Sequence, residues 1–194
     1  MSAPRWRGGW WTGARRRSSP NCGARPKDVA VELIVVHSIS LPPGEYGGDS
    51  VEHLFTNRLD WEAHPYFSQI RGLKVSSHFL VLRSGDCVQF VDCNRRAWHA
   101  GRSSWRGREN CNDFSVGIEL EGLEGSPFEP AQYETLSRLV GAVTRRYPIT
   151  AVVGHEHVAP GRKFDPGPGF DWLRLRASLL SRLAQVPALG ATAA

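Results

Sequence analysis

The most constraining feature of this sequence is a stretch near its C-terminal end, residues 152–172, which reads VVGHEHVAPGRKFDPGPGFDW. Each proline fixes its own φ and restrains the residue before it, whereas the glycines permit sharp turns between them. The apolar run at residues 149–153 predicts a buried strand, at the end of which His155 would lie. Asp165 follows ten residues later and could fold back toward His155. Such a loop is better suited to holding side chains in place than to linking domains.

The composition indicates one soluble globular domain. The chain has 194 residues, of which 41% are hydrophobic and 22% are charged, as in ordinary globular proteins. No apolar run reaches the roughly 18 residues of a membrane helix, and the basic N-terminus lacks the apolar stretch of a secretory signal. The four cysteines form no CxxC pattern and are expected to be reduced packing residues. We therefore expect a cytoplasmic protein with no membrane partner. The oligomeric state stays open from the sequence, with a monomer favoured.

Much of the net charge of +5 lies near the N-terminus. We separate residues 1–28 as a basic N-terminal segment, residues 29–184 as the main domain and residues 185–194 as a flexible tail. The arginine cluster at residues 15–17 could contact nucleic acid, but it is short and no nucleic-acid motif accompanies it. A solvated arm, parts of which pack on the core through tryptophans, is the simpler interpretation. We therefore expect no nucleic-acid partner.

Two apolar segments predict central strands. Residues 31–37, VELIVVH, are rich in β-branched side chains and end on His37, just before a loop of prolines and glycines. Residues 114–120, FSVGIEL, alternate between apolar and polar or small side chains. A glutamate on such a strand needs either an ion-pair partner or a functional role. Glu119 is a better functional candidate than Glu121, because it lies further from the following loop.

The remaining pattern predicts helices and strands elsewhere: helices over residues 50–59, 130–147 and 172–183, and a strand hairpin over residues 73–82 and 87–91. Asp171 is placed to cap the last helix. Residues 64–67 are expected to be a turn or loop, and residues 95–101 a loop. In the second loop Trp98 and His99 could line a cleft, although Trp98 is equally suited to the core and to stacking on a sugar ring.

Several of these residues match the needs of a catalytic zinc site, which has three protein ligands and one open position. Two imidazoles and a carboxylate are available from separate segments at His37, His155 and Asp165. Zinc would lower the pKa of a bound water to about 7 and polarise a carbonyl group. Glu119 could move the water's proton to a leaving amine, and Lys163 could stabilise an oxyanion. Together these are the parts of an amide hydrolase.

Spacing alone leaves one ligand open, because His157 lies in the same loop as His155. The sequence contains neither an HExxH helix nor a GxSxG motif, which argues against thermolysin-like and common serine hydrolases.

Five segments together resemble the bacterial N-acetyl-anhydromuramoyl-L-alanine amidase family, the AmpD type: HSISLPPGEYGG, HPYF, RAWHAG, CNDFSVGIELEG and GHEHVAPGRKFDPGPGFDW. The resemblance implies a single α/β domain in which a mixed central β-sheet is flanked by helices, as in phage lysozyme-type amidases and peptidoglycan recognition proteins. By match of motif, it assigns the Zn²⁺ ligands and the catalytic pair to His37, His155 and Asp165, and to Glu119 and Lys163. It favours His155 over His157, because the matching histidine directly follows a glycine.

The resemblance also implies a substrate and a biological role. The enzyme would cut the amide bond between anhydro-N-acetylmuramic acid and L-alanine in a small soluble muropeptide, for peptidoglycan recycling in the cytoplasm. We assign substrate contacts to Trp98, Tyr66, Arg162 and Lys74. Lys74 and Asn110 stand where relatives often carry arginines that hold a stem-peptide carboxylate, and neither provides the bidentate fork of arginine.

Two alternative hypotheses assign the chain to other functional classes. A non-catalytic peptidoglycan-binding module on the same scaffold would typically lack a complete ligand set, whereas Asp165 is present here. A nucleic-acid-binding protein would lose its DNA retention on deletion of residues 1–20, with hydrolysis left intact.

Overall fold

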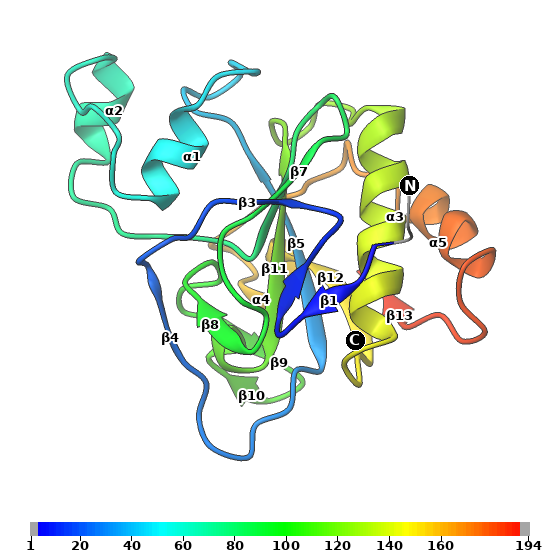
Figure 1. Ribbon diagram of the computed structural model, residues 1–194. Helices are drawn as coiled ribbons and strands as arrows, with labels where there is room; N and C mark the ends of the chain where they lie inside the picture. Colours follow the sequence, from blue (N-terminus) through cyan, green and yellow to red (C-terminus); the bar gives the residue numbers. More distant parts are fainter. Residues whose placement is uncertain (1–3, 191–194) are drawn as a thin grey trace.

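The computed structural model describes residues 4–190, which are built around a seven-stranded sheet of order β13-β12-β5-β11-β6-β7-β3 (Figure 1). Its strands are β3 (Arg15–Arg16), β5 (Leu33–Ile39), β6 (Phe79–Val81), β7 (Cys87–Gln89), β11 (Ser115–Glu121), β12 (Ala151–Gly154) and β13 (Ala188–Leu189). β13, β12, β5, β11 and β6 run parallel to one another, whereas β6 and β7 form the expected antiparallel hairpin. The predicted mixed sheet flanked by helices is confirmed.

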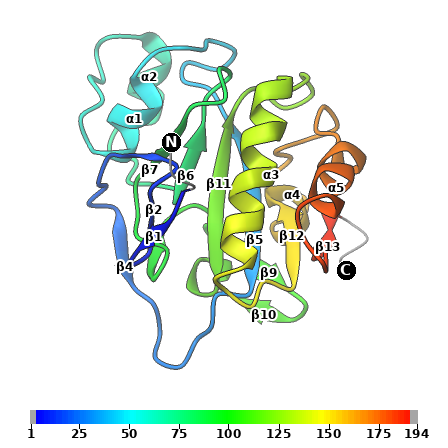
Figure 2. The ribbon, with the colours of Figure 1, turned by 45° about the vertical axis from the view of Figure 1, so that its right-hand side comes forward.

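One face of the sheet is covered by two helices, α3 (Pro130–Thr144) and α5 (Trp172–Leu180), which lie side by side in Figure 2. The apolar side chains that alternate along β11 pack beneath them in one buried cluster with Leu136 and Leu139 of α3. As predicted, Asp171 caps α5, because its carboxylate accepts a hydrogen bond from the backbone N–H of Arg174 at 2.9 Å. This face holds most of the hydrophobic core.

The opposite face carries shorter elements: α1 (Ser50–Phe55), α2 (Pro65–Gln69), α4 (His155–Val158), the 3₁₀ turn Cys111–Asp113 and the hairpin of β9 (Ser104–Trp105) and β10 (Arg108–Glu109). The expectation of a loop at residues 64–67 is wrong, because the His64 side chain accepts a hydrogen bond from Tyr66 N and Pro65 suits the first helical turn. Residues 95–101 were also expected to be a loop, but their first part is β8 (Arg95–Ala97), paired antiparallel with β4 (Cys22–Ala24).

The N-terminal segment packs onto the domain through strands that the sequence did not assign. A hairpin of β1 (Trp6–Arg7) and β2 (Trp10–Trp11) precedes β3, which extends the central sheet. Trp11 is buried in the core, and its backbone N–H donates to Gln89 Oε1 at 2.7 Å. The arginine cluster is anchored as well, because Arg15 forms an ion pair with Glu52 of α1.

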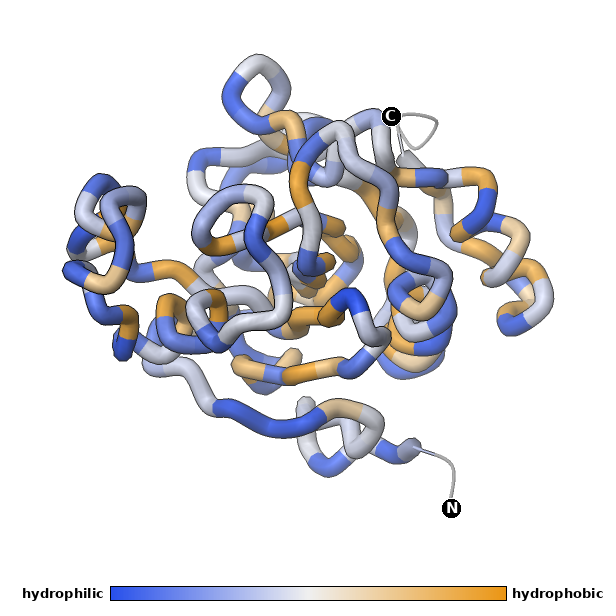
Figure 3. Tube along the Cα trace, turned by 90° about the horizontal axis from the view of Figure 1, so that it is seen from above, coloured by the Kyte–Doolittle hydropathy of each residue, from blue (hydrophilic) through white to orange (hydrophobic). Residues whose placement is uncertain are grey.

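The hydropathy-coloured trace in Figure 3 shows hydrophobic positions gathered at the centre and hydrophilic stretches on the surrounding loops. The Ala-rich tail, expected to be flexible, contributes β13, which pairs with β12 and closes that edge of the sheet. No helix within residues 4–190 is long and apolar enough to cross a membrane. The division of the chain at residues 28 and 184 stays a prediction.

Candidate metal centre

The candidate site lies at the carboxyl ends of three neighbouring parallel strands, β11, β5 and β12. In the register of the sheet, Glu119 pairs with His37, and Gly154 pairs with Val36. His155 directly follows Gly154 and therefore lies beside His37. Because the carboxyl ends of parallel strands meet at one edge of a sheet, strand pairing alone assembles these side chains.

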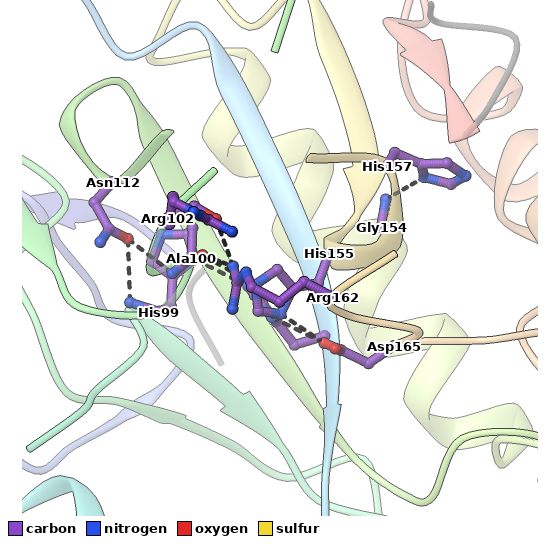
Figure 4. A network of polar contacts seen from close by, with 10 residues as sticks. His99, Ala100, Arg102, Asn112, Gly154, His155, His157, Arg162 and Asp165 are labelled. Carbon is purple, nitrogen blue, oxygen red and sulfur yellow. Dashed lines mark hydrogen bonds and ion pairs between the residues drawn. The ribbon is translucent and has the colours of Figure 1, made fainter. Parts of the chain in front are cut away.

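Asp165 reaches the same place because the proline-rich loop turns back over the end of β12. The backbone N–H of Glu156 donates to the carbonyl oxygen of Asp165 at 2.9 Å, which ties the loop to α4. Gly154 permits this approach, since a Cβ at that position would lie 2.8 Å from Pro166 Cδ. The predicted return of Asp165 toward His155 is therefore present (Figure 4).

Three buried donor atoms converge here. The His37 Nδ1 and His155 Nδ1 atoms lie 3.0 Å apart, and each lies 3.1 Å from Asp165 Oδ2. A tetrahedral metal with bonds of about 2.0–2.1 Å would hold its donors about 3.3 Å apart. The His155 Nε2 atom lies 3.1 Å from the carbonyl oxygen of Ala100, so it carries the proton and leaves Nδ1 with a lone pair. Donor type and spacing therefore fit a metal such as zinc.

The local electrostatics favour the metal-binding protonation states. Burial, reinforced by His155, lowers the pKa of His37 to about 4. Burial alone would raise the pKa of Asp165, but its close contacts with His155 and His37 hold it below its ordinary value. Neutral imidazoles and an ionised carboxylate are the forms that ligate a metal.

The predicted catalytic pair lines the pocket of 370 Å³ that opens beside these donors. Burial, followed by the negative charge of Asp165, raises the pKa of Glu119 well above its usual value, while Lys163 opposes this shift. Glu119 is only 6% exposed. Among residues 4–190 its carboxylate has no hydrogen-bond partner. A buried, unpartnered carboxylate at a pocket wall can take up and release a proton.

The predicted substrate-binding residues are distributed over a wider area. Tyr66 and Trp98 line the same pocket as the donors. Arg162 instead donates to the carbonyl oxygens of Ala100 and Arg102, at 2.8 and 2.6 Å, and lines a neighbouring pocket of 330 Å³. Lys74 is exposed and lines neither pocket. The structure thus brings two of the four to the donors, and their roles stay predictions.

The two histidines of the HEH sequence have different surroundings. His157 lies outside the donor group, since its Nδ1 accepts a hydrogen bond from Gly154 N at 2.8 Å and its ring packs against Trp172 (Figure 4). The geometry therefore favours His155 over His157 as a donor, and its role as a metal ligand stays a prediction.

His99 is a site residue whose role sequence reasoning missed. The pattern placed it at a cleft, and it does line the pocket, but its contact with His37 was not foreseen: His99 Nδ1 lies 2.9 Å from His37 Nε2. A Cβ on Gly117 would lie 2.5 Å from His99 Cγ, so β11 can accept this ring only where it has a glycine. A glycine inside a strand often marks such a close approach, and that was the available signal.

The family described as N-acetylmuramoyl-L-alanine amidase matches residues 27–168. The chain belongs to this amidase family. The amidase is 53% identical over 171 residues to the 1,6-anhydro-N-acetylmuramyl-L-alanine amidase AmpD of Citrobacter freundii, a match that covers 87% of this chain and 91% of that relative. The predicted AmpD-type family and amidase class are confirmed.

Solved structures agree with this assignment. The crystal structure of a selenomethionine derivative of AmpD superposes on the amidase with a TM-score of 0.87 at 51% identity, covering 89% of this chain and 98% of that chain. The amidase AmiD from Escherichia coli, in complex with the substrate anhydro-N-acetylmuramic acid-L-Ala-D-γ-Glu-L-Lys, matches with a TM-score of 0.56 at 30% identity. That match covers 90% of this chain and 65% of AmiD.

Proposed function

We propose that this amidase is a zinc enzyme that hydrolyses the amide bond between anhydro-N-acetylmuramic acid and L-alanine in small soluble muropeptides. Peptidoglycan recycling in the cytoplasm would be its role. The observation that carries the proposal is the convergence of His37, His155 and Asp165 beside a pocket that also holds Glu119 and Lys163. The substrate class is supported by the names of the relatives, AmpD and substrate-bound AmiD.

In this proposal the three converging donors would hold the zinc, which when bound supplies a Lewis acid for the amide carbonyl and lowers the pKa of water. Glu119 takes the proton from the attacking water and returns it to the leaving amine, a role that its raised pKa supports. Lys163 places a positive charge at the same pocket wall and stabilises the oxyanion of the substrate. Both steps depend on charged side chains whose electrostatic interactions are not fully screened by water.

Substrate binding follows from the walls of the pocket. Trp98 and Tyr66 offer aromatic faces on which the sugar can pack. Outside this pocket, Arg162 in the neighbouring pocket and the exposed Lys74 provide positive charge for the carboxylates of the stem peptide. Substitution Lys163→Met should lower kcat on the order of 10²–10³-fold with zinc retained, whereas the matched Lys74→Met should act mainly on KM.

The decisive experiment compares hydrolysis of a purified anhydro-muropeptide with release of peptide from intact sacculi. We expect fast cleavage of the soluble fragment and slow release from sacculi, with activity abolished by a chelator and restored by zinc. Full activity of the metal-depleted protein would refute the zinc mechanism. Equal rates on both substrates would refute the recycling role, and tight binding of the fragment without product would favour a binding module.

A further inference from the structure

Beyond the donor atoms, a second layer of contacts surrounds the two histidines and comes from one short turn. His99 Nδ1 lies 2.9 Å from His37 Nε2, and the next residue, Ala100, accepts a hydrogen bond from His155 Nε2 at 3.1 Å. The outward nitrogen of each histidine is therefore met by one of two adjacent residues. Such contacts fix the ring orientation and the tautomer of metal-binding histidines.

The turn itself is held rigidly. The side-chain oxygen of Asn112 accepts hydrogen bonds from the backbone N–H groups of His99 and Ala100, at 3.1 and 2.9 Å (Figure 4). The His99 ring lies over Gly117 and meets the His37 ring edge to face, with an interplanar angle of 85°. On its far side His99 Nε2 lies 3.1 Å from Ser115 Oγ.

Only one arrangement of protons suits metal binding. His37 must turn the lone pair of Nδ1 toward the other donors, so its Nε2 carries the proton and donates to His99 Nδ1. His99 then carries its own proton on Nε2 and donates it to Ser115 Oγ. The reverse arrangement would place a proton on His37 Nδ1, directly between the donors. A carbonyl oxygen can only accept, so Ala100 fixes His155 without any such choice.

We infer that His99, supported by Ser115, is a positioning residue that selects the metal-binding tautomer and orientation of His37. This inference rests on the proposed metal centre. His99 supplies none of the three donor atoms and touches only the outward side of His37, so it acts through His37. Its predicted effect is therefore on metal affinity, which can be measured without substrate.

The test is a zinc titration of the metal-free protein against a chromophoric chelator. His99→Leu keeps much of the bulk but removes the acceptor, and should raise the Kd for zinc on the order of 10–100-fold. His99→Asn returns an acceptor oxygen near the Nδ1 position and should restore most of the affinity. His157→Leu, a histidine outside the donor group, is the matched control and should leave the Kd unchanged.

The thermal unfolding midpoints of the metal-free variants show whether a substitution has damaged the fold. We expect His99→Leu and His99→Asn to have the same midpoint. Wild-type affinity in His99→Leu, or equal weakness in His99→Asn, would overturn the inference. If His99→Leu does not fold, Ser115→Ala provides the test. Loss of the Ser115 hydroxyl should still weaken zinc binding several-fold. An unchanged Kd would contradict the proposed chain of hydrogen bonds from His37 through His99 to Ser115. Failure of the wild-type protein to bind zinc would instead refute the metal centre itself.

Discussion

The two faces of β11 differ in chemistry although they are built from the same seven residues. On the helix-covered face, Val116, Ile118 and Leu120 are fully buried beneath α3. On the other face, Gly117 makes room for His99, and Glu119 lies at the pocket. Alternation along one strand thus places stability on one side and chemistry on the other. Substitutions on the two faces should therefore have separable effects.

On the face of β11 that carries the site, two buried carboxylates differ in their hydrogen-bond partners. Glu119 and Glu121 are both buried, 6% and 4% exposed. Glu121 accepts hydrogen bonds from the backbone N–H groups of Gly47 and Arg83, at 2.6 and 3.0 Å, and so joins two loops to the sheet. Glu119 has no such partner among residues 4–190. One carboxylate is committed to structure, whereas the other is available for proton transfer.

The largest effect is expected from Glu119→Gln, whose amide is nearly isosteric but cannot accept and return a proton. We expect kcat to fall on the order of 10²–10⁴-fold with zinc content and fold retained. Glu121→Gln is the matched control and should change kcat much less, with its cost appearing in stability. Steady-state kinetics and metal analysis of both variants decide the matter. Near-wild-type kcat in Glu119→Gln would show that the proton travels elsewhere.

The helix-covered face should respond in the opposite way. Leu136→Ala removes a fully buried side chain from α3 and should lower the free energy of unfolding by about 2–5 kcal/mol. Zinc content and kcat per folded molecule should stay unchanged, because the cavity lies across the sheet from the donors. Urea unfolding and active-site-normalised kinetics measure the two properties. A loss of zinc at full folding would show that the faces are coupled.

A smaller effect concerns His78, a buried histidine near the site that is not a donor. Burial, and secondarily Arg25, lowers the pKa of His78 to about 3, while the unfolded chain binds that proton below about 6.5. The unfolded state therefore holds more protons between these values, and stability is lost as pH falls through this window. This histidine contributes a slope of up to about 1.4 kcal/mol per pH unit.

Substitution His78→Asn removes this titration but keeps an acceptor for the backbone N–H of Gly117, which now donates to His78 Nδ1 at 3.0 Å. Unfolding free energies measured from pH 7 to pH 4 should fall less steeply in the variant than in the wild type. Identical slopes would mean that His78 takes up its proton over the same pH range in the folded and the unfolded protein.

Long periodic elements and the donor set were predictable from sequence. The alternation of β11, the amphipathic α3 and the Asp171 cap of α5 were all recognised, because each depends on local spacing. His37 and His155 were selected as donors because each was expected to end a buried strand. In the structure β5 continues two residues past His37, but the parallel pairing of β5 with β12 still brings the two histidines together. The role of His99 was not assigned, because its contact with His37 comes from a loop packed over Gly117 and not from strand pairing.

The N-terminal segment was hidden from sequence reasoning for a different reason. Its strands are two or three residues long, too short to show a period. Two of them, β3 and β4, also pair with strands that are distant in the chain. Trp11 nevertheless belongs to the core, and Ser19 Oγ donates to the carbonyl oxygen of Phe55 at 2.5 Å. Deletion of residues 1–20 should therefore destabilise the domain, so it cannot serve as a neutral test of nucleic-acid binding.

The central claim is that the proposed zinc is held by His37, His155 and Asp165. The most direct measurement is the zinc content of purified wild-type protein and of the pair His155→Ala and His157→Ala, determined by elemental analysis after equal dialysis. We expect about one zinc per chain in the wild type and in His157→Ala, and almost none in His155→Ala. Zinc retained by His155→Ala and lost from His157→Ala would contradict the account.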